Sequence, residues 1–216
     1  STFVDSDDIV PPWYIEELAS GIRQNEADMA IVQLAQICSQ DRPTFSAESN
    51  AALHFMRVDT TQALSMLLSR QGISESPCGK LAKTSFWAKH RFPEDRVYED
   101  LAVSVEIIAA LRVFAVSQAK IYGQVFRPES TSRKKEITNK QFKDWNNAIN
   151  DSLNAVLCAD KSKVLEKQTE CFLCLNYIRL IRQFRDIASP DSSSREILIE
   201  AERYLRDHKK EVFRNK

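Results

Sequence analysis

Two cysteines are the first candidates for chemistry, because Cys171 and Cys174 form a Cys-x-x-Cys pair. Zinc sites use such a pair twice or follow it with two histidines. The chain has no second pair, and its three histidines lie far apart in sequence. Since the pair also lies in an apolar helical run, we interpret both cysteines as core residues. We predict no metal site and no cofactor.

Arg203 and His208 form a second candidate pair, on the last predicted helix. An arginine can hold a phosphodiester while a histidine moves its proton. The Arg-x4-His spacing resembles that of HEPN-type ribonucleases, which are also all-α. The resemblance implies a ribonuclease that uses these two side chains, and the alternative is an exposed charged helix. We keep the ribonuclease as a third hypothesis and predict no catalytic residue.

Basic residues near aromatic ones form a third candidate set. Backbone phosphates require only such charges at regular intervals, and aromatic rings can stack on bases. The same side chains could instead pair with an acidic region of this chain or of a neighbouring copy. The predicted nucleic-acid-binding residues are Lys120, Lys134, Lys135, Arg179, Arg182 and Arg185.

Charge is unevenly distributed along the chain, although the net charge is zero. Residues 1–60 hold ten acidic and three basic residues, and residues 61–216 hold 20 acidic and 27 basic ones. This asymmetry predicts either a head-to-tail contact between copies or a basic body that meets an anion. Acidic pairs such as Asp7-Asp8 and Glu16-Glu17 are interpreted as solvated surface.

The composition excludes several classes of protein. A hydrophobic content of 43% is enough to bury a core, and only 4 glycines leave no Gly-rich phosphate loop. No nucleophile elbow and no His-Glu-x-x-His motif occur. The five cysteines lie in apolar stretches and are odd in number, so we expect a reducing compartment. The absence of a long apolar run and of a signal-peptide pattern predicts a cytoplasmic location and no membrane partner.

Apolar spacing predicts helices and no alternating strands. We expect an arm over residues 1–10, and Ser193 with Glu196 as the capping box of the last helix. The predicted fold is all-α, a multi-helix bundle of seven to eight helices with an N-terminal arm and no sheet. Residues 1–75 would form the arm and an acidic helical lobe, and residues 81–216 the main bundle with a mobile basic linker at 127–140. Helices are expected at 11–21, 25–40, 46–72, 81–90, 99–126, 141–159, 162–188 and 194–213.

Residues 90–150 contain a further pattern. Arg91-Phe92-Pro93 and Val97-Tyr98 precede a long apolar helix, and Asp144 to Ile149 follow a polar linker. This order resembles the coat proteins of rod-shaped or filamentous plant RNA viruses of the tobamovirus type. The resemblance implies an all-α bundle that stacks into a helical tube around RNA, and therefore a virion location as the alternative to a cytoplasmic one. The RNA-contacting arginines of that family would fall near Gln118 and Lys120.

We therefore predict a non-enzymatic, self-assembling protein that coats or packages single-stranded RNA. In this hypothesis the acidic arm of one copy meets the basic body of the next, and such a heterologous contact propagates into a ring or helix. The alternatives are an all-α scaffold or adaptor subunit without nucleic acid, and the HEPN-like ribonuclease.

Overall fold

The computed structural model describes residues 1–38, 53–126 and 136–212 of the chain. The chain divides into two compact units. The first, here called the sheet unit, comprises Ser1–Arg91 and Ile107–Pro128, and the second, the helical unit, comprises Phe92–Glu106 and Glu129–Lys216. The predicted division between residues 75 and 81 lies inside the sheet unit.

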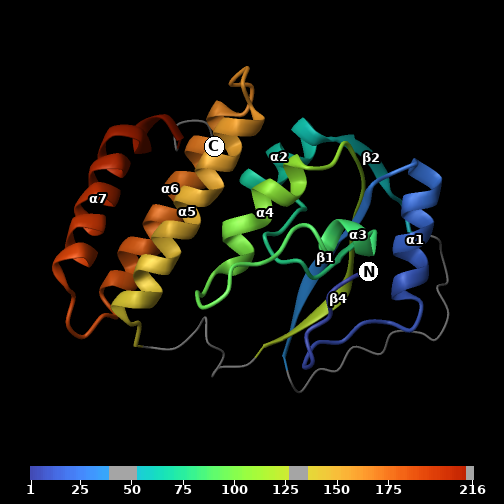
Figure 1. Ribbon diagram of the computed structural model, residues 1–216, viewed down its shortest axis with the longest axis horizontal. Helices are drawn as coiled ribbons and strands as arrows, with labels where there is room; N and C mark the ends of the chain where they lie inside the picture. The colour runs from blue at the N-terminus through green and yellow to red at the C-terminus, as the bar shows by residue number, and fades with distance from the viewer. Residues whose placement is uncertain (39–52, 127–135, 213–216) are drawn as a thin grey trace. The chain divides into compact units, whose positions relative to one another are not determined.

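The sheet unit is built on a four-stranded mixed sheet with the strand order β2-β4-β1-β3 (Figure 1). The two central strands, β1 and β4, run parallel, and each outer strand is antiparallel to its neighbour. The prediction of an all-α fold without a sheet is therefore wrong, because the described residues form a mixed α/β structure. The strands are β1 (Met29–Cys38), β2 (Met56–Asp59), β3 (Lys80–Ala82) and β4 (Val113–Phe126).

The central strands were expected to be helices, over residues 25–40 and 99–126, and both expectations are wrong. The first four residues of β1 are all buried. A strand covered on both faces reads as a nearly continuous apolar run, and periodicity does not distinguish such a run from a buried helix. β4 is rich in β-branched and aromatic residues, which favour a strand. The predicted helix at 99–126 ends at Ala109, where α4 (Glu99–Ala109) stops and β4 soon begins.

Helices cover both faces of the sheet. On one face α1 (Tyr14–Asn25) buries Tyr14 and Leu18 in a cluster that includes Ala30 of β1. The neighbouring strand residues Met29 and Phe114 are fully buried and point to the opposite face, because side chains alternate along a strand. There α2 (Thr60–Leu68) contacts β2 and β4. Figure 1 shows α1 and α2 on opposite sides of the sheet.

Within the predicted helix at 46–72, residues Met56–Asp59 form β2, and the helix α2 begins only at Thr60. Asp59 caps α2 instead, because its carboxylate accepts a hydrogen bond from the Gln62 amide and the Gln62 side chain binds back. Ser46, the predicted cap, lies outside the described residues. The predicted helix at 81–90 is limited to one turn, α3 (Thr84–Trp87), after β3.

The helical unit contains three long helices close to the predicted ranges. They are α5 (Asn139–Ala159), α6 (Glu166–Phe184) and α7 (Ser192–Val212). α5 buries Phe142, Trp145, Ile149 and Val156, which recur at the spacing of one helix face. The last part of the predicted linker at 127–140 belongs to α5, and residues 127–135 lie outside the described residues. None of the described helices combines the length and the apolar character needed to span a membrane.

Asp191 connects α5 with α7. Its Oδ1 accepts a 2.8 Å hydrogen bond from the Ser194 amide, and its Oδ2 lies 2.8 Å from Lys143 Nζ on α5. The amide bond is that of an N-cap, so Asp191 takes the role predicted for Ser193. The Lys143 hydrogen bond, followed by that of the Ser194 amide, lowers the pKa of Asp191 to about 2.

A low pKa in the folded state makes the contribution of Asp191 to stability dependent on pH. A carboxyl group whose pKa is lower when folded stabilises the protein above its unfolded pKa of 3.8. The contribution is lost as the pH falls through about 2. We expect Asp191→Asn to lower the urea midpoint at neutral pH, with a difference from wild type that shrinks between about pH 4 and pH 2. Glu202→Gln, an exposed change on α7, serves as the control, and a difference independent of pH would contradict the assignment.

Candidate functional site

Three carboxylates lie within four residues at the turn Asp5–Asp8, here called the aspartate turn. The segment before it pairs with β3, because Thr2 is the antiparallel partner of Leu81. β3 is itself antiparallel to β1, so this segment runs in the same direction as β1 and β4. The aspartate turn therefore follows the carboxyl end of an extended segment parallel to the central strands. Open α/β sheets bind ligands beyond the carboxyl ends of their parallel strands.

Tyr122 of β4 holds both ends of the aspartate turn. The Asp5 amide donates a 3.0 Å hydrogen bond to the Tyr122 hydroxyl, which donates a 2.7 Å hydrogen bond to Asp8 Oδ2. The other carboxylate oxygen, Asp8 Oδ1, accepts a 2.9 Å bond from the Val125 amide. The turn itself is closed by a 3.1 Å bond from the Asp8 amide to the Asp5 carbonyl. Both oxygens of Asp8 thus bind donors on β4, which assigns Asp8 to the support of the turn.

The environment of Tyr122 keeps its hydroxyl protonated. The ring is fully buried and lies edge-on to Tyr14, with the ring centroids 6.1 Å apart. Burial, followed by the hydrogen bond with the Cys78 thiol, raises the pKa of Tyr122 well above its ordinary value. Burial likewise raises the pKa of Cys78. Since the phenol remains neutral, it stays a donor to Asp8 throughout the physiological pH range.

Gly123 provides the backbone anchor after the turn. Its amide and carbonyl form two hydrogen bonds with Ile9, of 2.8 and 2.9 Å. A Cβ at position 123 would overlap Ile37 Cδ1 and lie 3.1 Å from the Ile9 carbonyl oxygen. The lack of a side chain at Gly123 therefore allows the chain after the aspartate turn to pair closely with β4.

Gly123→Val is expected to weaken this anchor. The added side chain must displace Ile37 or separate Ile9 from β4, and overpacking of this kind costs about 1–3 kcal/mol. We expect a lower free energy of unfolding in urea and faster hydrogen exchange at the Ile9 amide, which donates to the carbonyl of residue 123. Gln124→Val, a change at the next position of the same strand, is the control. Equal stability of the two variants would contradict this role of Gly123.

The carboxylates of Asp5 and Asp7 suit a divalent cation that also binds phosphate. Asp5 is exposed and Asp7 is half-buried. Mg²⁺ and Mn²⁺ prefer carboxylate oxygens, and beside nucleotide phosphates they need only one or two of them. Within the described residues no group of three or more His, Cys, Asp or Glu side chains is arranged to hold a metal by itself. The donor set at the turn fits a cation shared with a phosphate ligand.

A second acidic segment begins α4 in the helical unit. Tyr98 has a φ of +63°, which costs energy for a bulky residue. Its ring packs on Trp145 at a centroid distance of 4.8 Å, and its hydroxyl accepts a 3.4 Å bond from Gln183. Glu99 is exposed, while half-buried Asp100 accepts a 2.7 Å bond from the Leu101 amide through Oδ1. The surrounding contacts hold this strained backbone, a condition common at functional sites.

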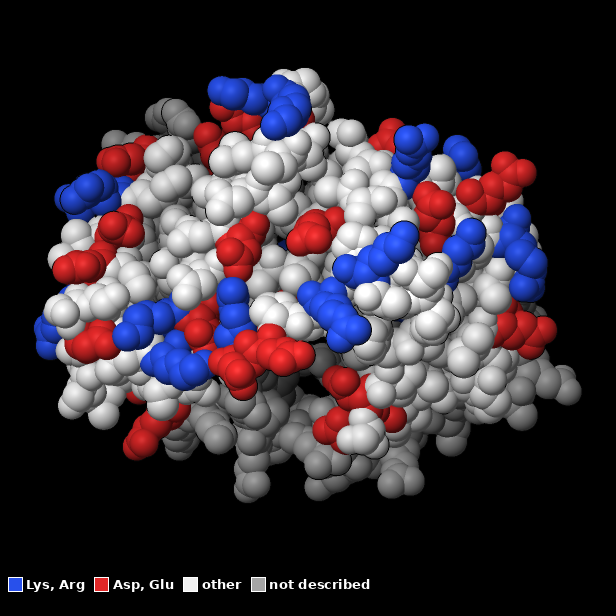
Figure 2. All heavy atoms as spheres, viewed as in Figure 1, with Lys and Arg blue, Asp and Glu red and all other residues white. Residues whose placement is uncertain are grey.

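The predicted nucleic-acid-binding residues are distributed over both units. Lys120 is exposed on β4 in the sheet unit, whereas Arg179 and Arg182 are exposed on α6 and Arg185 caps that helix. Lys134 and Lys135 lie outside the described residues. Figure 2 shows Lys and Arg interspersed with Asp and Glu among the described residues of this face, an ordinary pattern of solvated surface. RNA binding by these residues stays a prediction that the structure does not test.

The structure separates Arg203 from His208. Five residues on an α-helix correspond to roughly 140° around its axis, so the two side chains point apart. Arg203 is exposed, and the His208 ring stacks on Tyr204 with its Nδ1 2.9 Å from the Tyr204 carbonyl oxygen. The pair does not converge on one phosphodiester, and the ribonuclease hypothesis is wrong.

The Cys-x-x-Cys pair lies on α6, as expected for core residues. Cys174 is fully buried, and Cys171 is half-buried. Burial raises the pKa of Cys174 to about 11, so its thiol is a poor nucleophile at neutral pH. All five cysteines of the chain are free.

The aspartate turn is the functional segment that the sequence interpretation missed. Residues 1–10 were expected to form a solvated arm, and Asp7-Asp8 a pair without nearby partners. A usable signal was present, since the β-prone residues Thr2 to Val4 end abruptly at three aspartates. The hydrogen bond that anchors Asp8 could not be predicted from the sequence, because its partner Tyr122 lies 114 positions away.

Comparisons with known proteins concern the fold. No protein-family profile matches the chain, and no curated protein matches it in sequence. The structure of S. aureus TarS 1-349 in complex with UDP-GlcNAc is similar, with a TM-score of 0.50 and 13% identity over 97% of this chain and 67% of that one. The complex of the same fragment with UDP gives a TM-score of 0.45, with 13% identity, 97% of this chain and 66% of that one. The structure of S. aureus TarS gives 0.45 with 14% identity, covering 98% of this chain and 39% of that one.

The likeness to TarS extends over nearly the whole chain, whereas the coat-protein resemblance rested on short motifs within residues 90–150. The observed sheet excludes an all-α coat-protein bundle, so that resemblance is wrong. The predictions of a non-enzymatic RNA-coating protein and of an all-α scaffold are therefore also wrong. The fold is shared with a protein that has been solved with a nucleotide sugar.

Proposed function

We propose that the chain is part of a glycosyltransferase and binds the diphosphate of a UDP-sugar at the aspartate turn. The observation that carries this proposal is the aspartate turn itself, which follows an extended segment parallel to β1 and β4 and is anchored by Tyr122 in the carboxyl-terminal half of β4. The fold likeness to TarS supports it, because TarS 1-349 was solved with UDP-GlcNAc. The chain spans about two thirds of that fragment, so the activity of a longer protein is part of the proposal.

Electrostatics explains why aspartates would bind an anionic ligand. A diphosphate and two carboxylates repel each other unless a cation lies between them. Asp5 and Asp7 would hold Mg²⁺ or Mn²⁺, which would supply positive charge for the diphosphate. When bound, the cation neutralises negative charge on the departing UDP. Asp8 and Tyr122 would keep the two ligating aspartates in place.

Sugar transfer also requires a proton acceptor. The bond between the anomeric carbon and the diphosphate oxygen breaks, an acceptor hydroxyl oxygen bonds to that carbon, and the hydroxyl proton must leave. A positioned carboxylate can take this proton. Within the sheet unit, the aspartate turn would serve the donor side of this reaction.

Calorimetric titration with UDP-GlcNAc tests the proposed function. We expect binding in the presence of Mn²⁺ and loss of binding after addition of EDTA. An RNA oligonucleotide of equal charge is the control ligand, and its binding should not depend on Mn²⁺. Absence of UDP-GlcNAc binding at millimolar concentrations, or binding unaffected by EDTA, would contradict the proposal.

A further inference from the structure

An irregularity in β4 opens a pocket in the sheet unit. Ile31 of β1 pairs with Val116, and Leu34 pairs with Tyr122. Between these two pairs β1 advances three residues and β4 advances six, so β4 bulges. Bulges occur frequently beside active sites, where they redirect side chains. The bulge borders a pocket of about 260 Å³, lined by His54, Met56, Val116, Ser117, Gln118 and Ala119.

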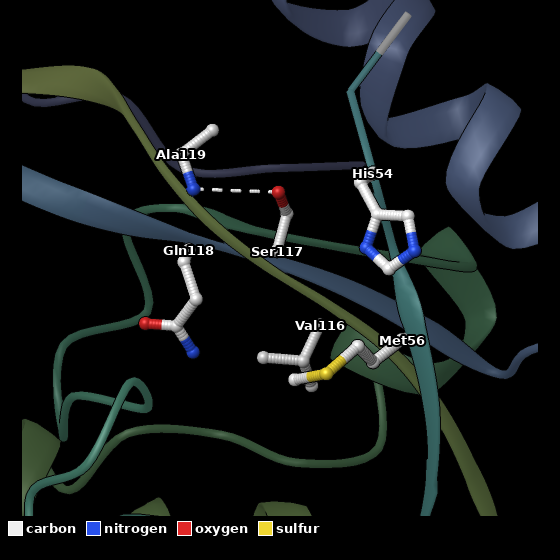
Figure 3. Close-up of a pocket in the computed structure, with 6 residues that line it drawn as sticks. All are labelled: His54, Met56, Val116, Ser117, Gln118 and Ala119. Atoms are coloured by element: carbon white, nitrogen blue, oxygen red, sulfur yellow. Dashed lines mark hydrogen bonds between the residues drawn. The ribbon is translucent and has the colours of Figure 1, made fainter.

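The pocket combines an apolar floor with two polar side chains. Figure 3 shows Val116 and Met56 between Gln118 on one side and the His54 ring on the other. The Ser117 hydroxyl accepts a 3.3 Å hydrogen bond from the Ala119 amide, so it supports the bulge. The amide of Gln118 and the imidazole of His54 are therefore the groups placed to bind a ligand.

Gln118 is held in position by two neighbours. Its Oε1 accepts a hydrogen bond from Gln33 of β1. Its Nε2 packs against Gly72, where a Cβ would lie only 2.8 Å away. Gly72 also has a φ of +95°, which disfavours any other residue there. The Gln118 amide is thus oriented in advance, with N–H donors on its nitrogen.

We propose that this pocket binds one saccharide or polyol unit of the acceptor, an inference that rests on the proposed glycosyltransferase function. A sugar ring has an apolar C–H face and a rim of hydroxyls, which match the exposed Met56 side chain and the polar groups of Gln118 and His54. Among the described residues no Lys, Arg, Asp or Glu lines the pocket, so this part of the lining favours an uncharged ligand. The volume is below the range of about 300–1,000 Å³ that is typical of drug-sized ligands, which indicates a single ring.

The position of the pocket along β4 agrees with its assignment to the acceptor. Ala119 precedes Gly123 by four residues, which span at most about 13 Å and less where β4 bulges. Gly123 pairs with Ile9, the residue that follows the aspartate turn. The pocket and the turn are thus close enough for a donor sugar and an acceptor unit to occupy neighbouring places on the sheet unit.

Methyl NMR tests the pocket directly. The probes are methyl β-N-acetylglucosaminide and glycerol, added to protein labelled with ¹³C at the Met and Ala methyl groups. We expect concentration-dependent shifts at Met56 and Ala119, and at least tenfold weaker binding in His54→Ala and Gln118→Ala. His54 is exposed, so its variant should fold normally. Gln124→Ala, outside the pocket on β4, is the matched control and should bind like wild type.

Two results would overturn the inference. One is the absence of shifts at Met56 and Ala119 with both probes at about 50 mM. The other is shifts that remain unchanged in His54→Ala and Gln118→Ala. UDP-GlcNAc titration of the same samples separates this inference from the proposed function. Glycoside shifts without UDP-GlcNAc binding would remove the transferase proposal and leave the pocket a saccharide site, whereas UDP-GlcNAc binding without glycoside shifts would remove only the acceptor pocket.

Discussion

Asp7→Asn is expected to reduce the Mn²⁺-dependent affinity for UDP-GlcNAc by about 10- to 100-fold. The substitution keeps the shape of the side chain but removes the negative charge that a cation requires. Losses of this order follow even when only the outer partners of a metal site are changed, so the direct loss of a ligand is at least as large. Calorimetric titration with UDP-GlcNAc at a fixed Mn²⁺ concentration measures the effect.

Two matched variants distinguish ligation from support of the turn. Glu16→Gln removes an exposed acidic residue on nearby α1 and should leave the affinity unchanged. Tyr122→Phe removes the hydroxyl that binds Asp5 and Asp8, so we expect a smaller loss that a higher Mn²⁺ concentration restores. An Asp7→Asn protein that binds UDP-GlcNAc as tightly as wild type would remove the aspartate turn as the binding site.

The first helix and the three long helices after residue 138 were predictable, because the local spacing of apolar residues determines them. α5 repeats its buried residues at helical spacing, as Phe142, Trp145 and Ile149 show, and it has a capping box at Thr138. α1 follows the two prolines at positions 11 and 12, which are suited to a helix start. In these helices one face is buried and the other is solvated, so the spacing of the apolar residues predicts the helix.

The central strands were not predictable in this way. The start of β1 and residues 114–117 of β4 are buried on both faces, which removes the alternation that identifies a strand. Sequence alone determined how much apolar surface these segments must bury and that they are ordered. Only the pairing of β1 with β4, more than 80 positions apart, decided that they are strands.

The candidate site likewise depends partly on the sequence alone and partly on the tertiary structure. The sequence by itself determined the supply of carboxylates at Asp5, Asp7 and Asp8, and the small residue at Gly123. The tertiary structure decided their roles, because Tyr122 binds Asp8 and the Asp5 amide only after β4 has joined the sheet. A carboxylate on an isolated arm is solvated surface. The same carboxylate becomes part of a candidate binding site when distant backbone and side-chain donors fix the turn that carries it.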